Sequence, residues 1–261
     1  SCRGLFLPRD ARLDARVRLT GALDQRWFVN RDDLKHGETC AVAAFNTVVT
    51  RDADTPAAEA DALARQQREM LLSLLRALEE MPGLAVKPVA VVAANPMYRR
   101  LPGKGDTHPE AMSRTDGTLQ RLTPAKLKYL VIPGSRGCRA SDADDRPGWF
   151  KRWFGTTAEL EPRDLAMLNS ILETDLVFVV NSRVHVTTDY TGAPRARLEL
   201  MEVIAAGRQE TADYVYARHV RGEMALADDG AAAVDVPYPR VLNAWQRACE
   251  LFRRDLQRQR R

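Results

Sequence analysis

Residues 40–50 read Cys-Ala-Val-Ala-Ala-Phe-Asn-Thr-Val-Val-Thr, a run of small and β-branched side chains without a charge. Such residues fit the pleated surface of a sheet, and a short continuous apolar run is typical of a buried strand. Asp52, Asp54 and Pro56 follow, and they predict the end of the strand and the first turn of a helix. We therefore expect a central strand here, and the other elements are predicted outward from it.

A long amphipathic helix is predicted next, from about Ala57 to Met81. Its apolar residues recur at spacings of three and four positions and form one stripe: Leu63, Met70, Leu71, Leu74, Leu75, Leu78 and Met81. Pro82 and Gly83 predict its end. The apolar segment 84–94 predicts a second buried strand, so strand, helix and strand would form a βαβ-like unit.

The segment 95–125 is predicted to be a long loop inserted into the domain. Residues 95–124 contain four Pro and three Gly and show no apolar periodicity. A third apolar strand is expected at 127–132, and a short amphipathic helix at 162–173.

The C-terminal half predicts an antiparallel meander, with strands that begin near residues 176, 195 and 211 and with turn residues between them. A second long helix is expected at 239–259, where Trp245, Cys249 and Phe252 lie on one apolar stripe. The expected fold class is therefore α/β, of the mixed α+β type: one sheet with an antiparallel meander, packed by two long amphipathic helices. Residues 1–35 are expected to form an N-terminal arm, and residues 36–261 a single domain.

The composition excludes a membrane-embedded protein. Of the 261 residues 28% are charged, and the apolar runs are far shorter than the roughly 20 residues that span a bilayer. The net charge is +4, and positive charge clusters visibly only near the C-terminus, at Arg253, Arg254, Arg258, Arg260 and Arg261. This cluster predicts a solvated helix end at the negative pole of the helix dipole. A cytosolic nucleic-acid-binding protein remains an alternative that the Arg content alone suggests.

The chain has four cysteines, Cys2, Cys40, Cys138 and Cys249, and none forms a CxxC pair. We therefore expect no metal site and no other cofactor. Cys2 follows Ser1, and a small residue before a Cys is typical of the point where a bacterial lipoprotein is cleaved and acylated. This predicts a lipid tether at Cys2 and a periplasmic protein anchored to the outer membrane, with a cytoplasmic location as the alternative. In an oxidising periplasm, Cys40 and Cys138 could form a disulfide.

Cys40 also motivates a competing hypothesis, a cysteine-dependent hydrolase. A nucleophilic thiol needs a lowered pKa and a nearby base, and His185 and Asp189 could supply the base and the acid that orients it. Against this, Cys40 opens a predicted strand rather than a helix, and His185 alternates with apolar neighbours on its own strand. We therefore expect no catalytic residue and keep the hydrolase as an alternative.

Residues 149–154 form the predicted partner-binding site: Trp149, Phe150, Lys151, Arg152, Trp153 and Phe154. Aromatic side chains that flank two cations suit a protein partner or a membrane interface. The alternative is that these rings pack onto the core. The acidic cluster Asp142, Asp144 and Asp145 is expected to be an exposed turn, because the Gly and the distal Glu of a calcium loop are missing.

The predicted elements follow one another in a recognisable order: the helix 57–81, the helix 164–173 before Asp175-Leu-Val-Phe-Val-Val180, and the segments 197–206 and 211–220. Over residues 40–220 this order resembles the α/β domain of curli-secretion-type lipoproteins, of the amino-terminal domain of the Tol-system β-propeller protein, and of related envelope lipoproteins. The resemblance implies a non-enzymatic envelope protein that binds a protein or polymer partner in secretion, envelope assembly or toxin inhibition. It implies contact with the membrane only through acylated Cys2, no nucleic-acid partner, and no catalytic residues. A homo-oligomer is compatible with it.

Overall fold

The computed structural model describes residues 18–22, 31–51, 60–100, 110–114, 117–122, 127, 162–188, 190–206, 214–226 and 237–261. The strands are β1 (Arg18–Ala22), β2 (Thr39–Arg51), β3 (Ala85–Val86), β4 (Glu110–Arg114), β5 (Gly117–Leu122), β6 (Leu176–Thr188), β7 (Pro194–Ala206) and β8 (Tyr214–Ala225). The helices are α1 (Arg31–His36), α2 (Ala60–Glu79), α3 (Val89–Ala94), α4 (Pro96–Arg100), α6 (Pro162–Leu172) and α7 (Pro239–Gln259). The strands form one eight-stranded sheet in the order β1-β8-β7-β6-β2-β5-β4, and β3 pairs with β2 outside this path.

The sheet is built around β2 and β6, two 13-residue strands that run parallel to each other. Residues 40–45 of β2 and 176–180 of β6 are all 0% exposed. A strand covered on both faces does not alternate apolar with polar residues, and this explains the unbroken apolar run of each strand. The chain continues from β6 into β7 and β8, which pair antiparallel in sequence order. The predicted fold class, a mixed sheet with a meander, is confirmed.

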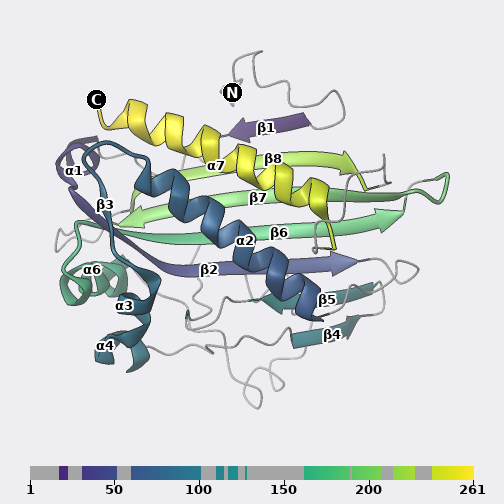
Figure 1. Cartoon of the computed structure of the whole chain (residues 1–261), viewed down its shortest axis with the longest axis horizontal. Coiled ribbons are helices and arrows are strands. Elements are labelled where there is room, and N and C mark those ends of the chain that lie inside the picture. Colours follow the sequence, from purple (N-terminus) through teal and green to yellow (C-terminus); the bar gives the residue numbers. More distant parts are fainter. Residues whose placement is uncertain are drawn as a thin grey trace.

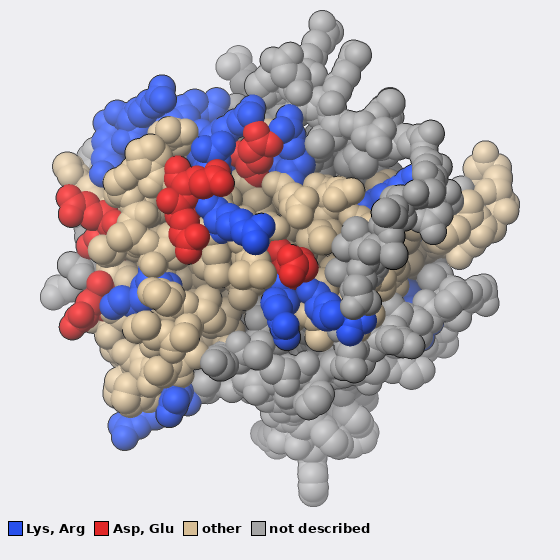
Figure 2. Space-filling model, viewed as in Figure 1, with Lys and Arg blue, Asp and Glu red and all other residues tan. Residues whose placement is uncertain are grey.

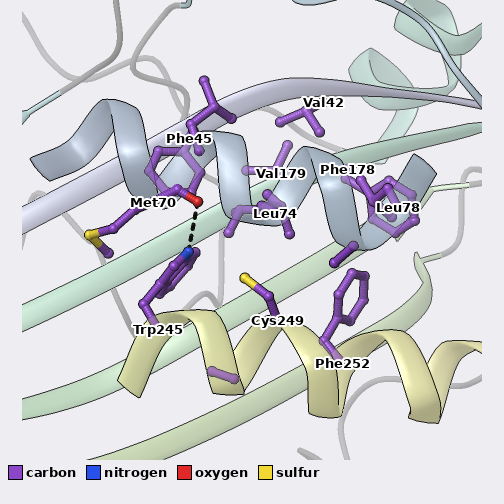
Figure 3. Close-up of a cluster of buried hydrophobic side chains, with 14 of the residues drawn as sticks. Val42, Phe45, Met70, Leu74, Leu78, Phe178, Val179, Trp245, Cys249 and Phe252 are labelled. Atoms are coloured by element: carbon purple, nitrogen blue, oxygen red, sulfur yellow. Dashed lines mark hydrogen bonds between the residues drawn. The ribbon is translucent and has the colours of Figure 1, made fainter. Parts of the chain in front are cut away.

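Helices α2 and α7 lie side by side across one face of this sheet (Figure 1). Phe45 of β2 meets Trp245 of α7 edge-on, with the ring centroids 5.4 Å apart. Phe178 of β6 meets Phe252 of α7 in the same way at 6.0 Å. The indole N–H of Trp245 donates to the carbonyl of Met70 in α2 at 2.7 Å, which joins the two helices above the sheet (Figure 3). The two apolar stripes predicted from the sequence therefore form this half of the core.

The end of α7 is fastened to two turns by Arg260. Its guanidinium donates to the carbonyls of Leu34, Gly37 and Gly83 at 3.1, 2.6 and 2.9 Å. Gly83 has a φ of 69°, a left-handed conformation that closes the end of α2 and that a residue with a Cβ rarely adopts. Arg260 thus ties the C-terminus to the segment before β2 and to the turn after α2.

The strand predicted at 84–94 is wrong beyond its first residues. Strand β3 contains two residues, which pair parallel with Thr39 and Cys40, and helix α3 begins after Pro88. Pro88 has a φ of -58° and no amide hydrogen, so it ends the pairing and suits the start of a helix. The following run, Val89–Ala94, is entirely apolar, so it shows no period that could separate a helix from a strand.

The loop predicted at 95–125 contains helix α4 and a β-hairpin. In the hairpin Arg114 of β4 pairs with Gly117 of β5, and β5 pairs with the second half of β2. Two residues, Thr115 and Asp116, separate the strands, and the surrounding Pro and Gly residues obscured the hairpin in the sequence. The strand predicted at 127–132 lies outside the described residues except for Leu127, which is buried.

The N-terminal arm predicted at 1–35 contributes two described elements to the domain. Strand β1 pairs antiparallel with β8 at the edge of the sheet, and Leu34 of α1 is completely buried. These parts of the arm therefore belong to the fold. The rest of the predicted arm lies outside the described residues.

Substitution of Phe252 by Ala is expected to destabilise the protein strongly, because this side chain is 0% exposed and packs against Phe178 and Tyr216. The free energy of unfolding should fall by about 3–5 kcal/mol, measured by urea denaturation. Leu72→Ala on α2, where the side chain is 36% exposed, is the matched control and should change it by less than about 1 kcal/mol. Equal losses in the two variants would contradict the described core.

Candidate functional site

Cys40, the candidate nucleophile, lies in the core at the start of β2. Burial raises the pKa of its thiol to about 12, and the positive charge of Arg260 lowers it by a smaller amount. A nucleophilic cysteine needs the opposite shift, because the thiolate is the reactive form. Burial likewise raises the pKa of Cys249 well above its usual value. Both thiols are therefore packing groups.

His185, the candidate base, lies far from Cys40. Cys40 pairs with Leu176 at the beginning of β6, whereas His185 pairs with Thr50. Thr50 follows Cys40 by ten positions, so the two groups are about 33 Å apart along the strand. The imidazole Nδ1 of His185 instead lies 2.7 Å from the hydroxyl of Thr50. The structure therefore separates the two groups that the hydrolase hypothesis needs together.

Several predicted site residues lie outside the described part of the chain: Cys2, Cys138, Asp189 and the segment Trp149–Phe154. The lipid tether and the aromatic partner site therefore stay predictions. Because Cys138 lies outside the described residues, the predicted disulfide between Cys40 and Cys138 stays a prediction.

Three arginines of the C-terminal helix, which was predicted to be a solvated helix end, lie against carboxylates of the same chain. Arg254 pairs with Glu250, Arg258 pairs with Asp255, and Arg253 lies 3.6 Å from Glu80, which follows α2. Figure 2 shows basic side chains gathered in a patch where α7 ends, and acidic and basic side chains next to one another over the middle of this face. These pairs offset part of the positive charge of this helix end, and the nucleic-acid alternative stays a prediction from the Arg content.

A different candidate site is formed by α3, α4 and α6, three short helices that lie together at the end of the sheet where β2 begins (Figure 1). Asn95 connects them. Its side-chain oxygen accepts from the backbone N–H groups of Met97 and Tyr98 at 2.9 and 3.2 Å and so caps α4. Its side-chain amide donates to the carbonyl of Ile171 in α6 at 3.2 Å. Lys87 in turn donates to the carbonyl of Leu172.

The helices are also bonded to the central strand. Ala43 is an extra residue in β2, because Val42 pairs with Phe178 and Ala44 pairs with the next residue of β6. The hydroxyl of Tyr98 donates to the carbonyl of Ala43 at 2.6 Å, and this hydroxyl is buried. Tyr98 thus anchors α4 to the bulge of β2.

The outer side of these helices exposes large apolar side chains. Val91 of α3, Met97 of α4 and Met167 of α6 are 49%, 43% and 44% exposed. Arg99 and Arg100 end α4 and are exposed as well. We call these five residues the α3–α4–α6 surface. In the region where Figure 1 places the helices, Figure 2 shows an area largely without charged side chains, with basic side chains along its lower edge and acidic and basic side chains at its upper left edge.

Such a surface can bind a ligand that combines apolar and negatively charged groups. The sequence offered one signal for its position, the dipeptide Asn95-Pro96, which is typical of an N-cap followed by the first residue of a helix. Exposure of Val91 and the two Met residues could not be predicted, because it depends on which side of each helix the sheet covers.

Within the described stretches, no three side chains of His, Cys, Asp or Glu are grouped so that they could hold a metal ion. Among the described helices, none has the length and the hydropathy of a transmembrane span.

No known family model matches the chain, and no curated protein matches it significantly. A solved structure that resembles it is that of the hypothetical protein CT253 from Chlamydia trachomatis, with 13% sequence identity and a TM-score of 0.30. The likeness covers 86% of this chain and 92% of that chain. A TM-score of this size carries no argument, so the function has to be argued from the surface itself.

The two buried thiols are expected to resist a thiol reagent in the native protein. In a variant with Cys2→Ser and Cys138→Ser, Ellman's reagent at pH 8 should label neither Cys40 nor Cys249, because a pKa of about 12 leaves roughly one Cys40 thiol in ten thousand ionised. Both should react in concentrated guanidinium chloride, which is the control. Rapid labelling of Cys40 in the folded protein would restore it as a candidate nucleophile.

Proposed function

We propose that this protein is a non-enzymatic envelope protein that works by binding a protein or polymer partner, in secretion, envelope assembly or toxin inhibition. The observation that carries the proposal is the α3–α4–α6 surface. Of the five large hydrophobic side chains exposed in the described part, three belong to it, Val91, Met97 and Met167. Single exposed apolar side chains are ordinary, whereas a group of them rimmed by polar residues is typical of a docking site.

The way in which the surface is held supports the same proposal. Asn95, Tyr98 and Lys87 fix the helices to one another and to β2. A surface whose backbone is already fixed loses little conformational entropy when a partner binds. The exposed side chains are therefore presented on a rigid support.

The described groups with catalytic potential favour binding over catalysis. Cys40 is buried with a raised pKa, and His185 lies at the other end of the same strand pair. The periplasmic location and the acyl group on Cys2 are part of the proposal as predictions from the sequence.

A photo-crosslinking amino acid placed at Met97 in the full-length protein should give a discrete covalent adduct in living cells, because this position lies in the proposed docking surface. The measurement is the shift of the protein on a denaturing gel, followed by mass spectrometry of the adduct. The control position is Tyr190, which is 99% exposed in the turn between β6 and β7. The proposal fails if Met97 gives no adduct, or if both positions give the same adducts in equal yield.

A further inference from the structure

We infer that the α3–α4–α6 surface docks an acidic amphipathic peptide segment of the partner. This inference rests on the proposed function and specifies the chemistry of the ligand. It follows from the charge around the apolar side chains, from the way in which the cations are held, and from the kind of apolar side chain that is exposed.

The charge of the surface selects a negative ligand. Residues 87–100 contain three cations, Lys87, Arg99 and Arg100, and no acidic residue. Residues 167–173 of α6 and its end add one acid, the exposed Glu173. The first part of α6 contains one cation and one acid, Arg163 and Asp164, so it adds no net charge. Opposite charge on the ligand would speed its encounter and fix its orientation.

The cations are held beside the apolar side chains. The Nε of Arg99 donates to the carbonyl of Ala93 at the end of α3, at 3.1 Å, so the guanidinium lies across the junction of α3 and α4. Arg100 follows on the same helix. A ligand that covers Val91 and Met97 therefore meets positive charge at the edge of the apolar contact, the arrangement of an apolar centre with a polar rim that protein interfaces show.

The apolar side chains favour a peptide over a membrane. The exposed residues are two Met and one Val, and Met is the residue that adapts to helical ligands of varied shape. Helices that lie in a membrane interface have a polar face rich in Lys and Arg and insert Trp, Phe or Leu. An amphipathic segment with apolar residues at i, i+3, i+4 and i+7 and acids between them complements such a surface.

The test uses a fluorescent synthetic helical peptide with Leu at the apolar positions and Glu at the others, titrated with the full-length protein. A peptide of the same pattern with Lys in place of Glu is the matched ligand control. We expect the Glu peptide to bind at least about tenfold more tightly than the Lys peptide, and the difference to shrink in high salt. Arg99→Gln with Arg100→Gln should reduce the difference between the two peptides.

The matched protein control separates the surface from the fold. Met97→Ser with Met167→Ser should lower the affinity for the Glu peptide by about tenfold or more, while Leu72→Ser on α2 should leave this affinity unchanged. These positions are exposed, so circular dichroism and the thermal midpoint should stay as in the parent protein. Equal affinity for the two peptides, or affinity that survives the double Met substitution, would overturn the inference.

Vesicles of phosphatidylglycerol provide the second ligand class. If the protein floats with these vesicles, loses this binding when Met97 and Met167 are substituted, and does not bind the Glu peptide, the ligand of the surface is a lipid membrane and the inferred peptide is wrong. A crosslink at Met97 in cells without Glu-peptide binding would refute the acidic segment and leave the protein-binding function standing. If neither the crosslink at Met97 nor binding of the Glu peptide is observed, the proposed function is wrong as well.

Discussion

The parallel pairing of β2 with β6, buried on both faces, is the constraint on which the rest of the structure depends. Its register is fixed at the first residues by Asp175, whose carboxylate accepts from the backbone N–H groups of Glu38 and Thr39 and from the Thr39 hydroxyl at 3.0, 2.9 and 2.8 Å. Further along, the side-chain amide of Asn46 donates to Asn181 at 2.7 Å. A slip by one residue would break these hydrogen bonds, so these polar groups specify the register of the pairing.

The candidate site follows from that core. Strand β2 has an extra residue at Ala43, and between its pairings with β3 and β5 its edge is open to another element. Helices α3 and α4 cover this edge, and the Tyr98 hydroxyl satisfies the carbonyl that the bulge displaces. An unpaired strand edge favours aggregation, and covering it with helices prevents this. The same helices then present Val91, Met97 and Met167 to solvent, so protection of the edge and display of the surface are one structural feature.

The sequence predicted those elements whose hydrophobic pattern is long and unambiguous. The stripe of α2, the stripe of α7 and the apolar run of β2 each contain enough residues to establish a period or its absence, and the meander was separated by clear turns. Helix α3 was missed because six apolar residues in succession show no period, and α4 because five residues are too few for a pattern. The hairpin β4–β5 was missed because its strands carry polar residues on an edge of the sheet.

The candidate site could be predicted much less well than the fold. Chemically reactive residue types directed attention to Cys40 and His185, yet their roles are decided by burial and by position along β2. The exposed Met and Val side chains have no reactive group, and in the sequence they look like any other apolar residues. Their exposure appears only when the sheet has determined the inner side of each helix.

Hydrogen–deuterium exchange of the protein, free and in complex with the partner purified from its native source, tests the central claim most directly. The account predicts that binding slows exchange in residues 89–100 and 167–172 and leaves the exposed side of α2, around residues 68–76, unchanged. Protection confined to other segments, with no change in α3, α4 and α6, would contradict it.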